Sequence, residues 1–103
     1  MSGYILTVTA QEDLIQIRDY YLEKAGRRVA RQMLVEFVKT FQFLAKTPGA
    51  GHKREDLAED RSVLFWPMRD YLVLYKSRTS PLEIVTIVRG SRDVPSTIRR
   101  RAL

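Results

Sequence analysis

Hydrophobic residues follow two different spacings along the chain, which divide it into a helical first half and a β-rich second half. Between residues 9 and 46, apolar side chains recur every three or four positions, the period of an amphipathic helix. Between residues 63 and 88 they form three short runs rich in Val, Ile, Leu, Phe and Tyr, which is typical of strands. The pattern predicts one strand, two helices and three further strands.

The first half is predicted to hold a strand and a pair of helices. Residues 4–8 are β-prone and lead into a capping box, in which the Thr9 hydroxyl accepts from a first-turn amide and Glu12 reaches back to the Thr9 amide. Gly26 is expected to end the first helix as a left-handed C-cap. The second helix covers 27–46, and the short link at Gly26 makes the two an antiparallel hairpin.

The second half is predicted to form a three-stranded meander after a polar loop at 49–60. Its strands cover 63–68, 71–77 and 82–88, with tight turns between them, so neighbouring strands are antiparallel. A single helical layer on one face of a four-stranded sheet buries both apolar faces. The predicted class is therefore α+β, with the N-terminal strand and the meander in one sheet.

Length and composition limit the chemistry that the chain can perform. Its 103 residues, 45% of them hydrophobic, predict one domain covering 1–103 with one modest core. The absence of cysteine excludes a disulfide scaffold, a thiolate zinc site and a thiol nucleophile. The single histidine, His52, excludes a His-rich metal site. We expect no metal and no cofactor.

The charge is strongly basic and favours acidic partners. Lys and Arg number 18 against 12 Asp and Glu, a net charge of +6, and the tail at 91–103 is rich in arginine. An acidic protein or a nucleic acid fits such a surface, although a solvated basic surface explains it equally well. No apolar run is long enough to span a bilayer and no signal peptide precedes the first strand, so we expect a cytoplasmic protein without a membrane partner.

Several short motifs occur in a fixed order between Tyr4 and about Ile98. They are Asp13-Leu14 and Ile17, the break at Gly26, Phe41-x-x-Leu44-Ala45-x-x-Pro48-x-x-Gly51, Tyr71-Leu72-Val73-Leu74-Tyr75, and Glu83-Ile84-Val85-x-Ile87-Val88-Arg89-Gly90-x-Arg92-Asp93. The ordered set resembles the RelE/ParE superfamily of bacterial toxins, and specifically ParE. The histidine that the family usually has before the glycine is Arg89 here.

This resemblance implies a toxin of a type II toxin–antitoxin system, of the kind that serves plasmid stabilization. ParE-like toxins inhibit DNA gyrase by stabilising its cleaved-DNA complex, and a cognate ParD-like antitoxin neutralises them. RelE-like relatives share the fold but cleave messenger RNA on the ribosome. A third possibility is an inactive remnant that only binds its antitoxin.

The residues at the ribonuclease positions separate an inhibitor from a nuclease. RelE-like ribonucleases carry lysines and an arginine on their central strands and a late tyrosine or histidine. When this chain is laid on that pattern, the two lysines become Val63 and Phe65, the strand arginine becomes Leu72, and the late tyrosine becomes Ile98. Only Arg92 keeps its residue type. Apolar side chains cannot transfer protons, so we expect no catalytic residues and no ribonuclease activity.

Two sets of binding residues are expected. Both alternating sets of the meander are apolar, so one of them should lie exposed on the open face of the sheet, unless the tail after Arg89 folds back over it. An antitoxin segment with acidic residues beside apolar anchors would cover that face, at Val63, Phe65, Trp66, Tyr71, Val73 and Tyr75. Contacts to gyrase or its DNA are expected from Arg61, Arg89, Arg92, Arg99, Arg100 and Arg101, without sequence-specific DNA binding by the toxin alone.

Overall fold

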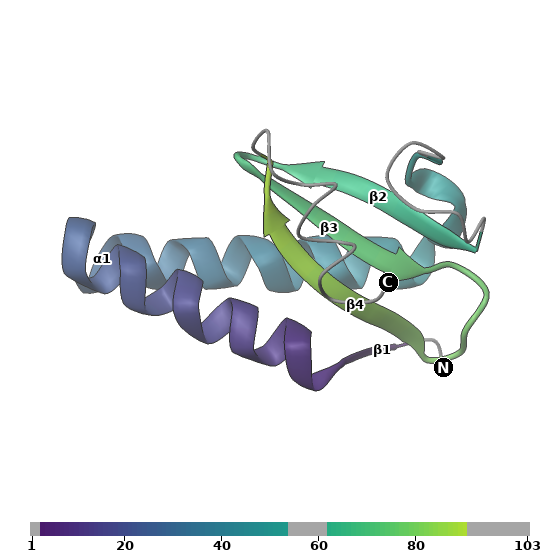
Figure 1. Cartoon of the computed structure of the whole chain (residues 1–103), viewed down its shortest axis with the longest axis horizontal. Coiled ribbons are helices and arrows are strands. Elements are labelled where there is room, and N and C mark those ends of the chain that lie inside the picture. The colour runs from purple at the N-terminus through teal and green to yellow at the C-terminus, as the bar shows by residue number, and fades with distance from the viewer. Residues whose placement is uncertain (1–2, 54–61, 91–103) are drawn as a thin grey trace.

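The computed structural model describes residues 3–53 and 62–90, which form an α+β fold with a four-stranded sheet (Figure 1). In chain order the elements are β1 (Tyr4–Leu6), α1 (Val8–Lys46), the short 3-10 helix η1 (Pro48–Ala50), β2 (Val63–Met68), β3 (Tyr71–Lys76) and β4 (Leu82–Arg89). The α+β class and the order of helical and β segments agree with the prediction from the sequence.

The sheet is mixed, with the strand order β1-β4-β3-β2. The pairs β2–β3 and β3–β4 are antiparallel. Strand β1 pairs with β4 in the parallel sense, with Tyr4 opposite Leu82 and Leu6 opposite Ile84. The first and last strands of the described chain are therefore neighbours, while β2 lies at the opposite edge.

The start of α1 differs from the predicted capping box. The N-cap is Thr7, whose Oγ1 accepts a hydrogen bond from the Ala10 amide at 3.0 Å, and Thr9 already lies within the helix. The Thr7 hydroxyl also donates to the Val85 carbonyl of β4 at 2.6 Å. The Thr7 hydroxyl thus accepts from an amide in the first turn of α1 and donates to a carbonyl of β4. Because Thr7 caps the helix, β1 ends at Leu6 instead of residue 8.

Helix α1 is interrupted at Gly26, whose φ of 89° and ψ of 175° are not helical. The positive φ agrees with the expected glycine break, but this ψ lies far from the left-handed helical value. The region is open essentially to glycine alone. In Figure 1 the chain reverses direction at this bend, so residues 8–25 are called the first arm and residues 27–46 the second arm.

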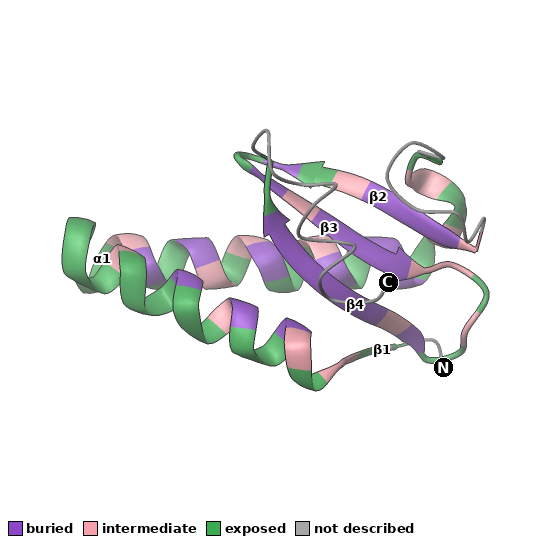
Figure 2. Ribbon diagram, in the orientation of Figure 1, coloured by how far each residue is buried: buried purple, intermediate pink, exposed green. Residues whose placement is uncertain are grey.

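The main core lies between α1 and one face of the sheet (Figure 2). The second arm contributes Phe37, Phe41 and Leu44, which are fully buried. The sheet contributes alternate side chains of its strands, among them Leu64, Met68, Tyr71, Val73, Tyr75, Ile84 and Ile87. The period of two along each strand and of three to four along the arm places these residues face to face.

A second cluster of apolar residues comes from the strand positions that alternate with the core. It contains Val63, Phe65, Leu74 and Val88, with Leu72 packed against it. The sequence left open whether this face is exposed or covered by the tail, and in the structure Val63 is only 7% and Phe65 only 1% exposed. The tail at 91–103, which the sequence offered as a cover for this face, lies outside the described residues.

A side chain of the first arm accepts hydrogen bonds from the part of β4 that extends beyond its pairing with β1. Asp13 Oδ2 accepts hydrogen bonds from the Thr86 hydroxyl at 2.7 Å and from the Ile87 amide at 2.9 Å. Asp13 is only 5% exposed. Since a buried edge amide needs an acceptor, this carboxylate fixes the first arm against the sheet edge.

The Tyr75 hydroxyl fixes the segment that follows α1. It donates to the Pro48 carbonyl at 2.7 Å and accepts from the Gly51 amide at 2.8 Å. A Cβ at Gly51 would lie 2.5 Å from the Tyr75 oxygen, so only glycine fits this close approach. Next along the chain, the His52 backbone exchanges two hydrogen bonds with Phe65 of β2, where the sequence suggested an irregular loop.

Candidate functional site

The six residues expected to bind an antitoxin do not lie on one surface. Tyr71, Val73 and Tyr75 face α1 and belong to the main core. Val63 and Phe65 belong to the second cluster on the other face of the sheet. Trp66 is partly buried at the margin of the main core. Both alternating sets of the meander are apolar, so residue type alone does not reveal which set faces α1.

Arg89 is the one member of the expected basic set that lies within the described residues. Its side chain is exposed at the end of β4, with Cζ 5.9 Å from the centre of the Tyr20 ring. Such a cation–π contact holds the guanidinium in place without neutralising it. Arg69, in the neighbouring turn, is instead paired with both carboxylate oxygens of Glu36 at 3.0 Å. Arg61, Arg92, Arg99, Arg100 and Arg101 lie outside the described residues.

Three tyrosines gather near Arg89. The rings of Tyr20 and Tyr21 meet edge to face at 5.1 Å, and Tyr71 is opposite Arg89 in the β3–β4 ladder. Burial, with a smaller contribution from a hydrogen bond to Tyr21, raises the pKa of Tyr71 to about 12. Its phenol therefore remains a neutral hydrogen-bond donor throughout the physiological pH range.

The raised pKa of Tyr71 predicts a loss of stability in alkali. In the unfolded chain this phenol titrates near its ordinary value of 10.0, whereas in the folded protein it does so near 12. The folded state therefore holds more protons in this window, and the free energy of unfolding falls as the pH rises through it. Unfolding midpoints measured across the window should fall less steeply for Tyr71→Phe than for the wild type. An equal slope for Tyr71→Phe and the wild type would contradict the assignment.

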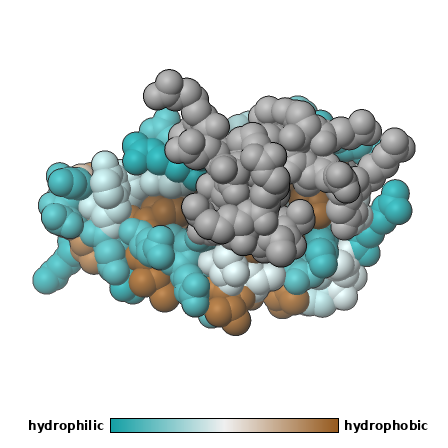
Figure 3. Space-filling view, in the orientation of Figure 1, coloured by the Kyte–Doolittle hydropathy of each residue, from teal (hydrophilic) through white to brown (hydrophobic). Residues whose placement is uncertain are grey.

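An apolar hollow of about 240 Å³ lies between the two arms of α1. It is lined by Leu6, Gln11, Leu14, Ile15, Arg18 and Leu34. Val8, Ile15 and Leu22 are exposed on the first arm, and Val35 and Val38 on the second. In Figure 3, hydrophobic side chains appear between hydrophilic ones along the arms. An exposed apolar surface of this kind is a candidate docking site for another molecule.

Three aromatic rings form a row where the second arm meets β2. The Trp66 ring lies 5.2 Å from Phe43 and 6.3 Å from His52, between centres, and the His52 and Trp66 planes are parallel within 3°. Phe43 is 43% exposed and His52 is also exposed. The row therefore reaches solvent, whereas the rings of Phe37 and Phe41 on the same arm are fully buried.

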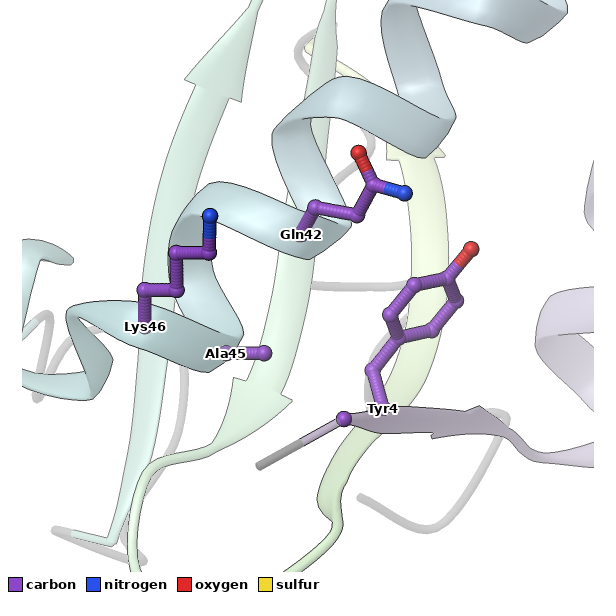
Figure 4. Close-up of a pocket in the computed structure, with 5 residues that line it drawn as sticks. Tyr4, Gln42, Ala45 and Lys46 are labelled. Carbon is purple, nitrogen blue, oxygen red and sulfur yellow. The ribbon is translucent and has the colours of Figure 1, made fainter. Parts of the chain in front are cut away.

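A second hollow, of about 480 Å³, lies between β1 and the end of the second arm (Figure 4). Its lining includes Tyr4, Gln42, Ala45 and Lys46. Figure 4 shows the Tyr4 phenol and the Gln42 amide extending toward the same region from the two elements. Lys46, which lines this hollow, follows Phe43 by three residues on the second arm.

The sequence analysis did not identify Asp13 as a buried carboxylate or Phe43 as an exposed ring, although the position of each on its helix indicates this. Asp13 falls on the same helical stripe as Ala10, Leu14 and Ile17, which marks a carboxylate that faces the core. Phe43 falls outside the stripe of Phe37, Phe41 and Leu44, which marks an aromatic ring that faces solvent. The hollow between the arms depends on the pairing of two helices, so the spacing within one helix does not reveal it.

The described residues offer few groups for metal or membrane chemistry. Over residues 3–53 and 62–90, no set of three or more His, Asp or Glu side chains is placed to hold a metal ion. In the same part of the chain, no helix combines the length and the apolar character that a membrane span needs. The candidate sites in the described part of the chain are the hollow between the arms, the aromatic row and Arg89.

Comparison with known proteins identifies the family. The family model described as the ParE toxin of the type II toxin–antitoxin system parDE matches residues 4–94. A solved structure titled as the chromosomal ParDE TA system from P. aeruginosa has the same fold, with a TM-score of 0.72 at 20% sequence identity, covering 88% of this chain and 98% of that one. No curated protein matches the chain in sequence. Because the family model covers most of the sequence, the chain belongs to the ParE toxin family of type II toxin–antitoxin systems.

Proposed function

We propose that this ParE-type toxin inhibits DNA gyrase by stabilising its cleaved-DNA complex, and that a cognate ParD-like antitoxin neutralises it. The protein acts by binding and not by catalysis. It works in the cytoplasm, where gyrase and DNA are found, and its module serves plasmid stabilization or the equivalent chromosomal role.

The observation that carries this proposal is the type of residue found at the sheet positions that correspond to the ribonuclease residues. They are occupied by Val63, Phe65 and Leu72, and these three pack together in one apolar cluster. Cleavage of RNA through its 2′-hydroxyl needs a group that takes a proton and cations that stabilise the phosphorane. A buried valine and phenylalanine supply neither, which favours an inhibitor over a RelE-like messenger-RNA endoribonuclease.

The antitoxin is proposed to bind the hollow between the two arms of α1. The cluster of Val63 and Phe65 is already buried, so it offers no free apolar surface, whereas Ile15 in the hollow is 47% exposed. Arg18 lines the same hollow. An amphipathic segment with apolar anchors and flanking carboxylates would match both the apolar lining and the net charge of +6. Trp66 remains a further antitoxin contact in this proposal.

Contacts to the gyrase–DNA complex are proposed at Arg89, together with Arg61, Arg92, Arg99, Arg100 and Arg101. A planar guanidinium binds phosphate or carboxylate with two parallel hydrogen bonds. Within the described part of the chain, no carboxylate forms an ion pair with Arg89, so its guanidinium is available for such a contact.

The proposal is tested with purified gyrase and supercoiled plasmid. Linear DNA should accumulate after protein denaturation when the toxin is present, and Arg89→Ala should reduce the amount. Arg28→Ala, at an exposed arginine of the second arm outside the proposed contacts, is the matched control and should behave as the wild type. In parallel, messenger RNA in a ribosome-programmed translation assay should remain intact. RNA cleavage that Arg92→Ala abolishes, with no effect on gyrase, would overturn the proposal.

A further inference from the structure

The aromatic row of Phe43, Trp66 and His52 is surrounded by lysines. Lys39 and Lys46 lie four residues before and three residues after Phe43 on the second arm, so both share its face of the helix. Lys53 directly follows His52. All three lysines are exposed. Together these six residues are called the aromatic–lysine patch.

Within the described residues, no ion pair engages the lysines of the patch. The ion pairs between residues of 3–53 and 62–90 are Arg18–Asp19, Arg69–Glu36 and Lys76–Glu83, and none of them includes Lys39, Lys46 or Lys53. Unpaired ammonium groups beside exposed rings attract an anionic ligand with flat apolar groups. Two ligand classes have this character, an acidic protein and a nucleic acid.

The composition of the patch favours nucleic acid. Lysine is depleted at protein–protein interfaces, whereas lysines that contact phosphates supply much of the affinity of nucleic-acid-binding proteins. Exposed aromatic rings stack on unpaired bases in proteins that bind single strands. Bases in a duplex present only their edges, so a row of rings suits a strand whose bases are unpaired.

We propose that the aromatic–lysine patch binds a single-stranded stretch of nucleic acid without sequence preference. Bases stack on the exposed faces of Phe43 and His52, while Trp66 supports both rings from within the row. The ammonium groups of Lys39, Lys46 and Lys53 contact the phosphates. The hollow beside Lys46 extends the path of the strand toward Tyr4 and Gln42 (Figure 4). This binding is separate from the proposed inhibition of gyrase and does not depend on it.

The test uses the intrinsic fluorescence of Trp66, which is the only tryptophan in the chain and lies at the centre of the patch. The full-length toxin is titrated with oligo-dT or oligo-U of roughly 12 nucleotides, within the usual site sizes of single-strand binders. Both should change the fluorescence, and a duplex of the same length should bind at least tenfold more weakly. With about three phosphate contacts, the slope of log K against log salt should be roughly −2.

Variants separate the patch from general basic charge. Phe43→Ala should weaken binding at least tenfold, and Lys46→Ala should make the salt slope shallower by about 0.7. Lys24→Ala, at an exposed lysine near Gly26, is the matched control and should bind as the wild type. Circular dichroism of each variant confirms that it is folded.

The outcomes distinguish the source of the strand and the class of ligand. Equal binding of oligo-dT and oligo-U shows that the sugar is not read, and binding of one alone identifies DNA or RNA as the source. The proposal is overturned if neither oligonucleotide changes the fluorescence, if Phe43→Ala binds as tightly as the wild type, or if poly-glutamate competes as well as oligo-dT at equal charge. Since gyrase is absent from this assay, its result is independent of the gyrase test.

Discussion

Replacing Asp13 with alanine is expected to lower the free energy of unfolding by about 3 kcal/mol, because one buried carboxylate oxygen accepts two hydrogen bonds from β4. The change removes the acceptor of the Ile87 amide, which lies at a sheet edge where β1 has already ended. For a domain of this size the loss corresponds to a fall in Tm of roughly 12–24 °C. Thermal or urea unfolding, followed by circular dichroism, measures it directly.

Two further variants give this prediction its controls. Asp13→Asn keeps an acceptor oxygen but removes the charge, so it should lower the free energy of unfolding by less than Asp13→Ala does. Glu12→Ala changes the neighbouring exposed carboxylate and should alter stability by less than about 0.5 kcal/mol. If Asp13→Ala proved as stable as Glu12→Ala, the carboxylate would not be what fixes the first arm to the sheet.

Truncation of Phe65 to alanine is expected to cost about 3–5 kcal/mol, as a large cavity in a packed core does. Phe65 is 1% exposed and packs with Leu74 and Val88 on the face of the sheet opposite α1. If that face were the free docking surface that the sequence suggested, the same change would cost little stability and would instead weaken antitoxin binding.

Phe43→Ala is the matched control for Phe65→Ala. It removes the same ring from a position that is 43% exposed, so its cost should be below about 1.5 kcal/mol. Urea unfolding of both variants provides the comparison. Equal losses at the two positions would show that burial does not distinguish these two rings.

The sequence predicts the elements of this fold better than the way in which they meet. The helical and strand periods locate α1, β2, β3 and β4 to within a residue or two, because each period reflects contacts along a single element. The capping box at Thr9 fails since Thr7 has a second partner, the Val85 carbonyl, about 80 positions further along the chain. Such a partner is invisible to any local pattern.

For the candidate sites too, the sequence predicts what lies within one element better than how elements meet. Val63 and Phe65 lie on one face of the sheet, as their spacing of two residues along one strand predicts. The proposed antitoxin surface mixed two faces, since an apolar residue type does not reveal which side of a sheet it occupies when both sides are apolar. The hollow between the arms, and the meeting of Phe43 with Trp66 and His52, depend on how the elements pack, which only the three-dimensional structure supplies.

The parallel pairing of β1 with β4 also has a consequence during synthesis of the protein. Tyr4 and Leu82 are partners in the ladder, so the ribosome must make nearly 80 further residues before the first strand finds its neighbour. At translation rates of about 5–20 residues per second, the nascent chain remains without a completed sheet for roughly 4–16 seconds. A long-range contact of this kind also slows folding itself. The sheet can therefore be completed only once nearly the whole toxin chain has been made.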